Sequence, residues 1–592
     1  MEPLTKSYTS SYDSQHPLRE DLTLYKVFEE AKGKGLVGEI LNLETNTRIS
    51  TEEVFAKADQ YAKGLLACGC VPGKDALCSM GVSSLEPISL FVAAASIGVG
   101  FGKPYIYTPR EQCIINVVSA LEPKVIVVGE ADYGDTFSAL VPLFDDCETP
   151  TSSKLPTVKH VFYDHTHKDR SPSHKFLNNL DKLIEMGKVI TDDELAAAKR
   201  SVQPGHDLFY TFSSGSTGKP KCIVHTNVGL ANDLLLLPDS SGPVLTMNPS
   251  MDETSSFAFV VGILAGKTVR LILSMQITPE NAVEKTGMLP DVILNEKIET
   301  LGMGGQLVQL IAHHMKRKGN VEVPHLKYIL YGGQVVTRQF KENIKAVFGE
   351  KHIAVYGMSE VAIVSLAPTE DGPEYEEARL DGKLYIKPNL EIRLVDQHSE
   401  IVDIGEEGEL EVKTYSSFKE YKGMEEKTRA TFTKDGFVKT GDVAVMFADG
   451  SHHIRGRATD AFRFKIMAKA FYPGPIEDIL VQFPGVTNAV VSVALTNDAY
   501  GDEVTYCISM SESVPIPSEQ DLLDFMKKKG IDKHQMPARI LYFDSFPSTP
   551  NSRKISKPGV KEEIMKRVEA DPNAGITQWY KKLCDTVTNG FE

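Results

Sequence analysis

The sequence predicts an α/β protein: a large N-terminal body of α/β subdomains, a β-rich subdomain and a small α+β C-terminal domain. The chain has 592 residues. Because domains usually hold about 100 to 200 residues, we expect several folding units. Apolar runs alternate with amphipathic stretches as far as about Leu366, which is typical of a largely parallel sheet covered by helices. Beyond that point, alternating polar and apolar residues favour strands with one solvated face.

The first predicted elements are two helices and two strands. The amphipathic stretch 52–68 predicts a helix, 75–80 a strand, and the small-residue stretch 87–97 a second helix. The run 124–129, KVIVVG, is short, apolar and closed by glycine. Such a run is typical of a strand that is buried on both faces.

The later elements follow a stretch of loops rich in Ser, Thr, Pro, His and Asp. Strand-like residues 207–212 resume the α/β pattern, and the β-rich section is predicted at 382–412. Strand-like stretches at 489–494 and 506–510 then precede a helix-like stretch at 519–528. These predict a smaller α+β lobe.

Composition excludes several classes of function. Sixty-four Lys and Arg against 80 Asp and Glu give a net charge of −16, so the overall field should repel nucleic acid and anionic membranes. The eight cysteines lack paired zinc spacing and disulfide density. The longest apolar run, 90–102, is too short to span a bilayer, and no signal peptide is evident. We therefore expect a cytoplasmic location, no nucleic-acid partner and no membrane span.

The segment Tyr210–Lys221 carries the strongest chemical signal. A short strand runs into four hydroxyls, two glycines and two lysines. Glycine lets backbone N–H groups turn toward an anion, hydroxyls add donors, and lysine adds charge, so this segment predicts a phosphate site. It differs from a P-loop because Gly215 and Gly218 have only two residues between them and Pro220 follows Lys219. A solvated Ser/Gly linker is the alternative.

This segment resembles the phosphate-binding signature of the adenylate-forming superfamily, which includes acyl-CoA synthetases, adenylation domains and beetle-type luciferases. Cys222 replaces the final glycine of that signature. The resemblance implies an ATP-binding N-terminal adenylation domain at 1–457 and a small mobile C-terminal domain at 458–592. The residues that it assigns to the phosphates are Ser213, Ser214, Gly215, Ser216, Thr217, Gly218, Lys219 and Lys221.

A second signature of the superfamily is matched by the sequence YGMSE, and a third by the preceding YGGQ. The resemblance implies that Gly333, Gln334 and Tyr356 frame the adenine, with Gly357 and Ser359 also at the nucleotide. It further implies that Glu360, together with Thr217, binds Mg²⁺. A carboxylate with phosphate oxygens and water is the environment that Mg²⁺ usually adopts. A turn with an exposed glutamate is the alternative for an isolated pentapeptide.

Three later segments keep the order of the superfamily: GEEGEL, KTGD and GR. The resemblance assigns Asp442 to the ribose hydroxyls, which a carboxylate can accept together, and Arg457 would assist it. The hinge between the domains is expected at Thr459 or Asp460. Ala468 stands where the superfamily has glycine near the coenzyme A channel.

The final signature contains a catalytic lysine, and the register here allows two residues. The segment PSTPNSRKI places Arg553 at that position without a gap and Lys554 with one inserted residue. Lys554 is preferred because Lys557 then also falls at the expected place. A solvated lysine is the alternative.

The resemblance therefore implies an AMP-forming acyl-CoA synthetase that uses ATP, Mg²⁺ and coenzyme A. Lys554, Glu360 and Lys221 are its predicted catalytic residues. The substrate is expected to be a carboxylic acid, weakly a medium-chain fatty acid, because Gly302 near the implied acid pocket adds little bulk. A luciferase-like enzyme without coenzyme A transfer and a non-catalytic nucleotide-binding protein are the alternatives. His225 is interpreted as a packing residue, and the oligomeric state is not predicted.

Overall fold

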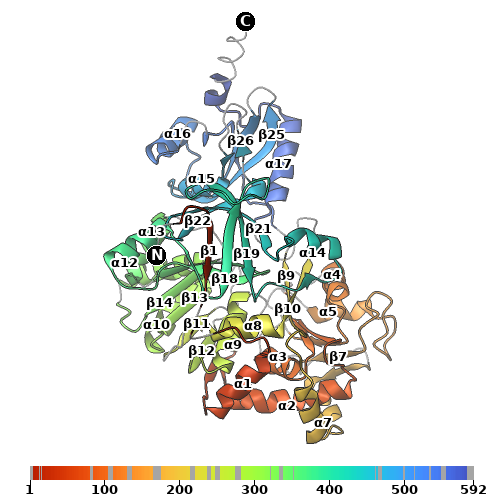
Figure 1. The fold of residues 1–592 in the computed structure, drawn as a ribbon. Coiled ribbons are helices and arrows are strands. Elements are labelled where there is room, and N and C mark those ends of the chain that lie inside the picture. The colour runs from red at the N-terminus through yellow and green to blue at the C-terminus, as the bar shows by residue number, and fades with distance from the viewer. Residues whose placement is uncertain are drawn as a thin grey trace.

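The structure is a computed structural model of the chain (Figure 1). The residues that it describes are 4–12, 14, 17–80, 85–104, 111–129, 136–164, 175–213, 220–236, 242–246, 254–273, 282–319, 322–332, 338–350, 352–460, 462–463, 470–497, 501–511, 514–531, 535–548 and 555–582.

The first sheet contains eight of the described strands, and its middle is parallel, as predicted. Strands β9, β5, β4, β6, β7 and β8 are parallel neighbours, whereas β10 and β20 add an antiparallel edge. All four residues of β6 are buried, which confirms the strand predicted at 124–129. In spatial order the strands are β20 (Glu420–Tyr421), β10 (Lys221–Thr226), β9 (Asp207–Ser213), β5 (Gly100–Gly102), β4 (Ala76–Met80), β6 (Val125–Val128), β7 (His160–Tyr163) and β8 (Leu177–Asn179).

The second sheet contains nine of the described strands and is parallel from β15 to β2. Antiparallel strands close both of its edges. Its strands are β17 (Tyr385–Ile386), β16 (Ala362–Leu366), β15 (His352–Met358), β14 (Tyr328–Gly332), β13 (Thr300–Gly304), β11 (Val244–Thr246), β12 (Arg270–Leu273), β2 (Glu39–Asn42) and β3 (Thr47–Ser50).

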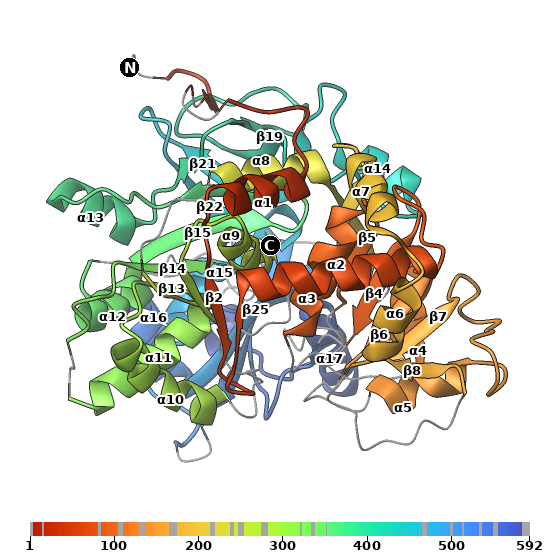
Figure 2. The same cartoon turned by 90° about the horizontal axis from the view of Figure 1, so that it is seen from below.

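Helices between these two sheets share a hydrophobic cluster with strands of both. Figure 2 shows β4, β6 and β7 on one side and β13, β14 and β15 on the other, with α2 and α3 between them. The ring of Phe209 on β9 stacks on that of Phe257 on α9 with centroids 4.0 Å apart, which joins the sheets through apolar contact. The described helices of this body are α1 (Leu24–Gly33), α2 (Thr51–Ala67), α3 (Glu86–Ser96), α4 (Glu111–Leu121), α5 (Thr136–Leu140), α6 (Leu180–Gly187), α7 (Asp192–Arg200), α8 (Asn227–Leu235), α9 (Thr254–Leu264), α10 (Ala282–Asn295), α11 (Gly305–Arg317), α12 (Arg338–Phe348), α13 (Pro373–Asp381) and α14 (Glu425–Thr431).

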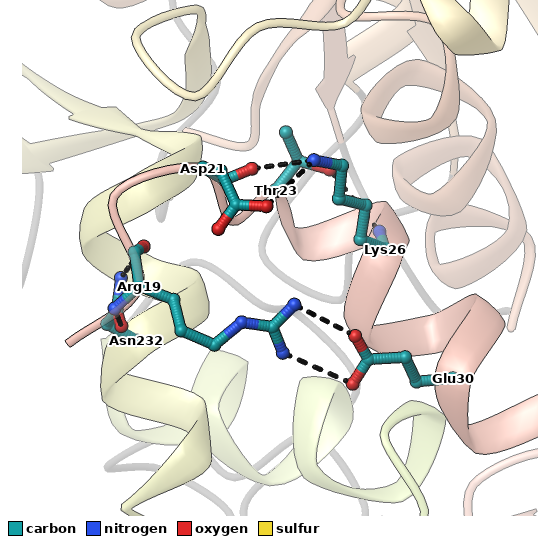
Figure 3. Close-up of polar contacts among 6 residues, drawn as sticks. All are labelled: Arg19, Asp21, Thr23, Lys26, Glu30 and Asn232. Carbon is teal, nitrogen blue, oxygen red and sulfur yellow. Dashed lines mark hydrogen bonds and ion pairs between the residues drawn. The ribbon is translucent and has the colours of Figure 1, made fainter. Parts of the chain in front are cut away.

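Polar contacts fix α1 against α8. The backbone N–H and C=O of Arg19 bond to the side-chain amide of Asn232 on α8, both at 2.9 Å (Figure 3). The Arg19 guanidinium pairs with Glu30 on α1 at 3.0 Å. Thr23 caps the helix by accepting from the backbone N–H of Lys26, as N-cap residues commonly do. The segment before α1 is therefore held to an element about 200 residues later in the chain.

The β-rich section forms a third, antiparallel sheet of five described strands. Its strands are β1 (Tyr8–Ser11), β18 (Leu390–Val395), β19 (Glu407–Thr414), β21 (Val438–Met446) and β22 (His452–Arg457). The start of the chain supplies the edge strand, which the sequence did not predict. Strand β1 pairs with β18 from Tyr8 opposite Arg393 to Ser11 opposite Leu390.

The C-terminal lobe is small and α+β, as predicted, and stands above the body in Figure 1. Predicted stretches 489–494 and 506–510 lie in its two long strands, and the helix predicted at 519–528 is α16. The described elements are β23 (Phe462–Arg463), β24 (Ala470–Phe471), α15 (Pro473–Leu480), β25 (Val486–Asn497), β26 (Gly501–Met510), α16 (Glu519–Lys528), β27 (Arg539–Tyr542) and α17 (Lys557–Ala570). None of the described helices combines the length and the apolar composition that a bilayer-spanning segment requires.

Candidate active site

The predicted phosphate loop connects two paired strands. Strand β9 ends at Ser213 and β10 begins at Lys221, and these two residues are antiparallel partners. The pairing brings the two ends of the loop together, so the segment joins a hairpin rather than opening a helix as a P-loop does. Residues 214–219, which include Thr217, lie outside the described residues.

Lys221 lies beside an aromatic ring and a carboxylate. Its Nζ is 4.9 Å from the centroid of the Tyr421 ring on β20, within the range of a cation–π contact. Burial lowers the pKa of Lys221, and the nearby Glu360 carboxylate raises it again in part. The lysine at the end of the loop is thus half-buried against Tyr421, whose hydroxyl bonds to the predicted metal ligand Glu360.

Glu360 lies in the turn between β15 and β16 and is only 6% exposed. The Tyr421 hydroxyl donates a 2.8 Å hydrogen bond to its Oε1. No other hydrogen bond to this carboxylate occurs within the described ranges. Burial, followed by the Glu360 carboxylate, raises the pKa of Tyr421 and keeps the phenol protonated as a donor. The alternative of an exposed glutamate in a turn is therefore wrong.

Asp442 on β21 is held from both sides. Tyr356 on β15 donates from its hydroxyl to Oδ2 at 2.7 Å, and the Nε of Arg457 on β22 lies 3.0 Å from Oδ1. Arg457 also donates to the Thr440 carbonyl at 2.7 Å. Burial raises the pKa of Asp442 and Arg457 lowers it. Each carboxylate oxygen has a second lone pair that can still accept a ligand hydroxyl.

The Asp442 group and the Glu360 group belong to one site. Two tyrosines connect these groups: Tyr421 bonds to Glu360 and its ring contacts Lys221, whereas Tyr356 bonds to Asp442 and packs against the hydrophobic cluster that contains Tyr421. The charges agree with this arrangement, because the Glu360 carboxylate raises the pKa of Asp442 and the Arg457 guanidinium lowers that of Lys221. Residues from β10, the β15–β16 turn, β20, β21 and β22 therefore lie close together.

Other predicted site residues divide between those described and those not. A bulge between Tyr356 and Gly357 shifts the pairing of β15 with β16, and Ser359 stands in the turn before Glu360. The predicted residues outside the described ranges are Ser214, Gly215, Ser216, Thr217, Gly218, Lys219, Gly333, Gln334, Ala468, Arg553 and Lys554, and the side chain of Ser213 is also not described. Tyr421 is a site residue that the sequence reasoning missed, because no motif contains it.

The predicted hinge carries an ion pair. Lys557, the first residue of α17, has its Nζ 3.0 Å from Asp460 and 3.6 Å from Glu477 on α15. Burial raises the pKa of Glu477, and Lys557 lowers it in part. Lys557 thus ties the start of α17 to Asp460.

The space beside Gly302 is filled. A Cβ at Gly302 on β13 would lie 2.3 Å from the ring of Phe259 on α9. Glycine is therefore required there for close packing. The inference from the sequence that the missing side chain leaves room for an acyl chain does not hold at this position.

His225 on β10 is buried in the interior, 2% exposed. Burial lowers its pKa to about 4, although a hydrogen bond with the Ser359 backbone opposes the shift. The ring is consequently neutral near pH 7.

The comparison with protein families decides the assignment. The family described as AMP-binding enzyme matches residues 30–422. The chain belongs to the AMP-binding enzyme family. This AMP-binding enzyme is 26% identical over 537 residues to a 2,3-dihydroxybenzoate-AMP ligase of Bacillus subtilis (strain 168), which covers 89% of this chain and 90% of the relative. It is 24% identical over 581 residues to the mitochondrial medium-chain acyl-CoA ligase ACSF2 of Danio rerio, covering 95% and 92%.

Solved structures show the same fold. ATP-bound MatB from Rhodopseudomonas palustris matches with a TM-score of 0.70 and 19% identity, covering 93% of this chain and 99% of that one. The anthranilate CoA ligase AuaEII in complex with anthranoyl-AMP matches with a TM-score of 0.75 and 16% identity over the same shares. The match to the AMP-binding enzyme family makes this chain an adenylate-forming ligase, and the solved structures share its fold of a large N-terminal and a small C-terminal domain.

Proposed function

We propose that this AMP-binding enzyme is an ATP-dependent acid:thiol ligase that converts a carboxylic acid to its acyl adenylate and then to its coenzyme A thioester. The observation that carries the proposal is the meeting of Lys221, Glu360 and Asp442 at one site, each buried or half-buried and each engaged by an aromatic or cationic partner. Such a set can neutralise phosphate charge, hold a cation and accept ribose hydroxyls.

The residue roles within this proposal follow the motifs. Tyr356, with Gly333, Gln334, Gly357 and Ser359, would frame the adenine. Asp442 and Arg457 would hold the ribose. The residues proposed for the phosphates are Ser213, Ser214, Gly215, Ser216, Thr217, Gly218, Lys219 and Lys221.

Glu360 fits a magnesium ligand. Its carboxylate is buried, accepts one hydrogen bond in the described structure, and lies near the lysine that ends the phosphate loop. Thr217 would supply the second protein oxygen. Bound there, Mg²⁺ would offset charge on the departing pyrophosphate. The Tyr421 hydroxyl orients the carboxylate for that task, as partners of metal ligands commonly do.

The first step joins two anions, so the protein must position them and neutralise charge. A carboxylate oxygen of the acid attacks the α-phosphorus of ATP, the bond to the β-phosphate oxygen breaks, and pyrophosphate leaves. Lys554 would bridge the carboxylate and the α-phosphate, with Lys221 on the outer phosphates. In the second step the thiol of coenzyme A loses its proton and attacks the acyl carbon, and AMP leaves.

The second step is proposed to use the C-terminal lobe. We place the domain boundary at Arg457, with 1–457 as the adenylation domain and 458–592 as a mobile domain that turns near Thr459 or Asp460. A short 3₁₀ helix, Ala458–Asp460, directly follows β22 and supports a hinge at these residues. Coenzyme A is the proposed acceptor because several relatives are named CoA ligases.

The relatives are named for two classes of carboxylic acid, aliphatic and aromatic. A medium-chain fatty acid has support from the relative named for such acids, whereas the dihydroxybenzoate and anthranilate enzymes are named for aromatic acids. The filled space beside Gly302 favours a compact acid. We also propose a cytoplasmic location, which the unpaired described cysteines support.

The test is an AMP-release screen of aliphatic and aromatic acids, with and without coenzyme A. AMP release that needs both an acid and coenzyme A, with formation of the thioester, supports the ligase. Acid-dependent AMP or adenylate without a thioester favours an enzyme that uses another acceptor, and light emission with a luciferin favours a luciferase-like one. ATP binding without acid-dependent AMP would leave only a nucleotide-binding protein.

A further inference from the structure

We propose that Tyr421 is a positioning residue with two separable contacts: its hydroxyl orients Glu360, and its ring supports Lys221. The predicted cation ligand and the lysine that closes the phosphate loop are thereby held at a fixed separation. This inference rests on the proposed function, because it bears on catalysis only if these two side chains hold the cation and the phosphates of ATP.

Both contacts come from one buried side chain. The Tyr421 hydroxyl donates to Oε1 of Glu360 at 2.8 Å, and the Nζ of Lys221 lies 4.9 Å from the centroid of the same ring. The tyrosine is only 3% exposed, so it has little freedom to move away from either partner. Because a tyrosine carries its polar end at a fixed distance from its ring face, a displacement of the ring would shift both partners.

Neither partner has a competing side-chain contact in the part of the chain that the structure describes. Lys221 forms no ion pair there, and the Glu360 carboxylate accepts no second hydrogen bond. The ammonium keeps its donors for phosphate oxygens, and the carboxylate keeps lone pairs for a cation. Tyr421 therefore fixes where the two charged groups lie without occupying the sites that a ligand would use.

The backbone on either side of Tyr421 is bonded to the strand that follows the phosphate loop. The N–H groups of Lys419 and Lys422 donate to the carbonyls of Val224 and Cys222 at 2.7 and 2.8 Å. These bonds make the short strand β20 an edge of the sheet next to β10. The tyrosine is thus anchored to the same strand that begins with the supported lysine.

The segment before Tyr421 also holds the turn that carries Glu360. The Phe418 N–H donates to the Glu360 carbonyl at 2.7 Å, and the Ser416 hydroxyl donates to the Val361 carbonyl at 3.2 Å. Regular pairing alone cannot fix this turn, because a bulge interrupts β15 and Ala362 has a φ of 56°. One stretch of chain, 416–422, therefore connects the metal-ligand turn to the phosphate-loop strand.

Aromatic packing fixes the Tyr421 ring. Its centroid lies 4.6 Å from that of Phe418, which in turn stacks on Phe432 at 5.0 Å. The Tyr421 N–H donates to the Thr428 hydroxyl on α14 at 3.0 Å. A binding group is placed most accurately when packing and hydrogen bonds lock the residues that support it. The ring is locked in this way before any ligand binds.

The experiment separates the two contacts by measuring ATP binding with and without a cation. Isothermal titration calorimetry gives the dissociation constant of ATP in EDTA and in saturating Mg²⁺. No acid is present, so turnover does not contribute. The ratio of the two constants reports the contribution of the cation site. Tyr421→Phe keeps the ring and removes the hydroxyl, whereas Tyr421→Leu removes both.

Tyr421→Phe should lower this ratio about tenfold or more, the usual effect of removing a partner of a metal ligand. Tyr421→Leu should in addition weaken ATP binding in EDTA by about two- to fivefold, which corresponds to the loss of one cation–π contact. A merely structural role would weaken binding equally in both buffers. Tyr506→Phe is the matched control: it removes a buried hydroxyl that donates to the Gln535 carbonyl in the C-terminal lobe, and it should leave both constants unchanged.

Double variants assign each contact to its partner. In the Glu360→Gln background, Tyr421→Phe should change the ratio no further. In the Lys221→Met background, Tyr421→Leu should weaken ATP binding in EDTA no further. Each pair acts through one interaction, so its effects cannot add.

An unchanged ratio in Tyr421→Phe would overturn the inference, and this result decides even if Tyr421→Leu does not fold. Equal ATP affinity of the Phe and Leu variants in EDTA would overturn the ring contact. Wild-type protein that binds ATP and Mg²⁺ through Glu360 but releases no AMP with any acid would refute the proposed function and leave the role of Tyr421 standing. ATP binding that is indifferent to both Glu360→Gln and Lys221→Met would overturn both.

Discussion

The hydroxyl of Tyr356 donates to Asp442, 86 residues later in the chain, at 2.7 Å. The contact joins a strand of the nine-stranded sheet to a strand of the five-stranded one. Since Asp442 is only 7% exposed, this bond and the Arg457 contact keep a buried carboxylate charged and oriented.

Tyr356→Phe should raise the KM for ATP and leave kcat nearly unchanged. Hydrogen bonds to charged groups contribute about 1.5 to 3 kcal/mol, which corresponds to roughly a tenfold or larger change in binding. Steady-state kinetics with varied ATP checks this. Tyr331→Phe is the matched control, because that buried hydroxyl contacts His352 instead. Equal effects of the two changes would contradict a specific role in nucleotide binding.

Lys554→Ala should slow adenylate formation by roughly 10²- to 10³-fold, the usual loss when one charge-stabilising donor is removed. Acid-dependent pyrophosphate exchange measures this step without coenzyme A. Arg553→Ala is the comparison that resolves the register, and it should retain most of the exchange rate. A large loss in the arginine variant with a normal lysine variant would reverse the assignment.

Lys557→Met should destabilise the C-terminal lobe by about 1 to 3 kcal/mol, because it leaves the largely buried Glu477 without its cation. Trp579, the only tryptophan, packs against the core of this lobe, so its fluorescence during urea unfolding reports the change. Adding Glu477→Gln should recover part of the loss. Lys561→Met, an exposed position on the same helix, should have little effect. If both lysine variants unfold at the same urea concentration, the ion pair contributes nothing.

Stability should fall as the pH drops from about 6.5 toward 4. Burial lowers the pKa of His225 and His352 to about 4 and that of His452 to about 3. Below pH 6.5 these histidines are protonated in the unfolded state but stay neutral in the folded state. Their neutral burial therefore contributes its full share to the free energy of unfolding only above that pH. The loss is about 2 kcal/mol for each ring at pH 5.

One carboxyl acts in the opposite direction in the same range. Burial, followed by Glu477, raises the pKa of Asp478 to about 7, so this group favours the folded state as the pH falls. Three rings outweigh it. Urea unfolding at pH 7.5, 6 and 5 measures the sum, and His452→Gln should flatten the slope. An unchanged unfolding midpoint between pH 7.5 and 5 would contradict the expectation.

Phe259→Ala should allow longer acids to react. The ring fills the space beside Gly302, and each methylene newly accommodated in an apolar pocket changes kcat/KM by about 10-fold or more. Rates over a series of straight-chain acids measure the change, with Phe259→Leu as an intermediate. If the preferred chain length is the same in all three proteins, Phe259 does not border the acid.

Local sequence signals predicted the regular elements well. The stretch 124–129 could be predicted as a buried strand because a short apolar run closed by glycine indicates one without knowledge of the rest of the fold. The amphipathic stretch 52–68 likewise predicted helix α2. The motifs also singled out Glu360 and Asp442 as candidate site residues, and the structure buries both side chains.

Contacts between distant short elements could not be predicted. Tyr421 reaches Glu360 because the two-residue strand β20 pairs with β10, and no pattern of two residues indicates a strand. The edge strand β1 likewise has no partner nearby in the sequence. It pairs with β18, about 380 residues later, so its strand conformation is evident only in the assembled sheet.

The position of edge strand β1 determines when its sheet can form during synthesis. The hydroxyl of Tyr8 donates to Glu391 at 2.7 Å across 383 residues. On a ribosome that adds about 5 to 20 residues per second, the first residues emerge tens of seconds before their partner strand exists. They must wait unpaired, while the intervening sheets assemble, before the antiparallel sheet can close.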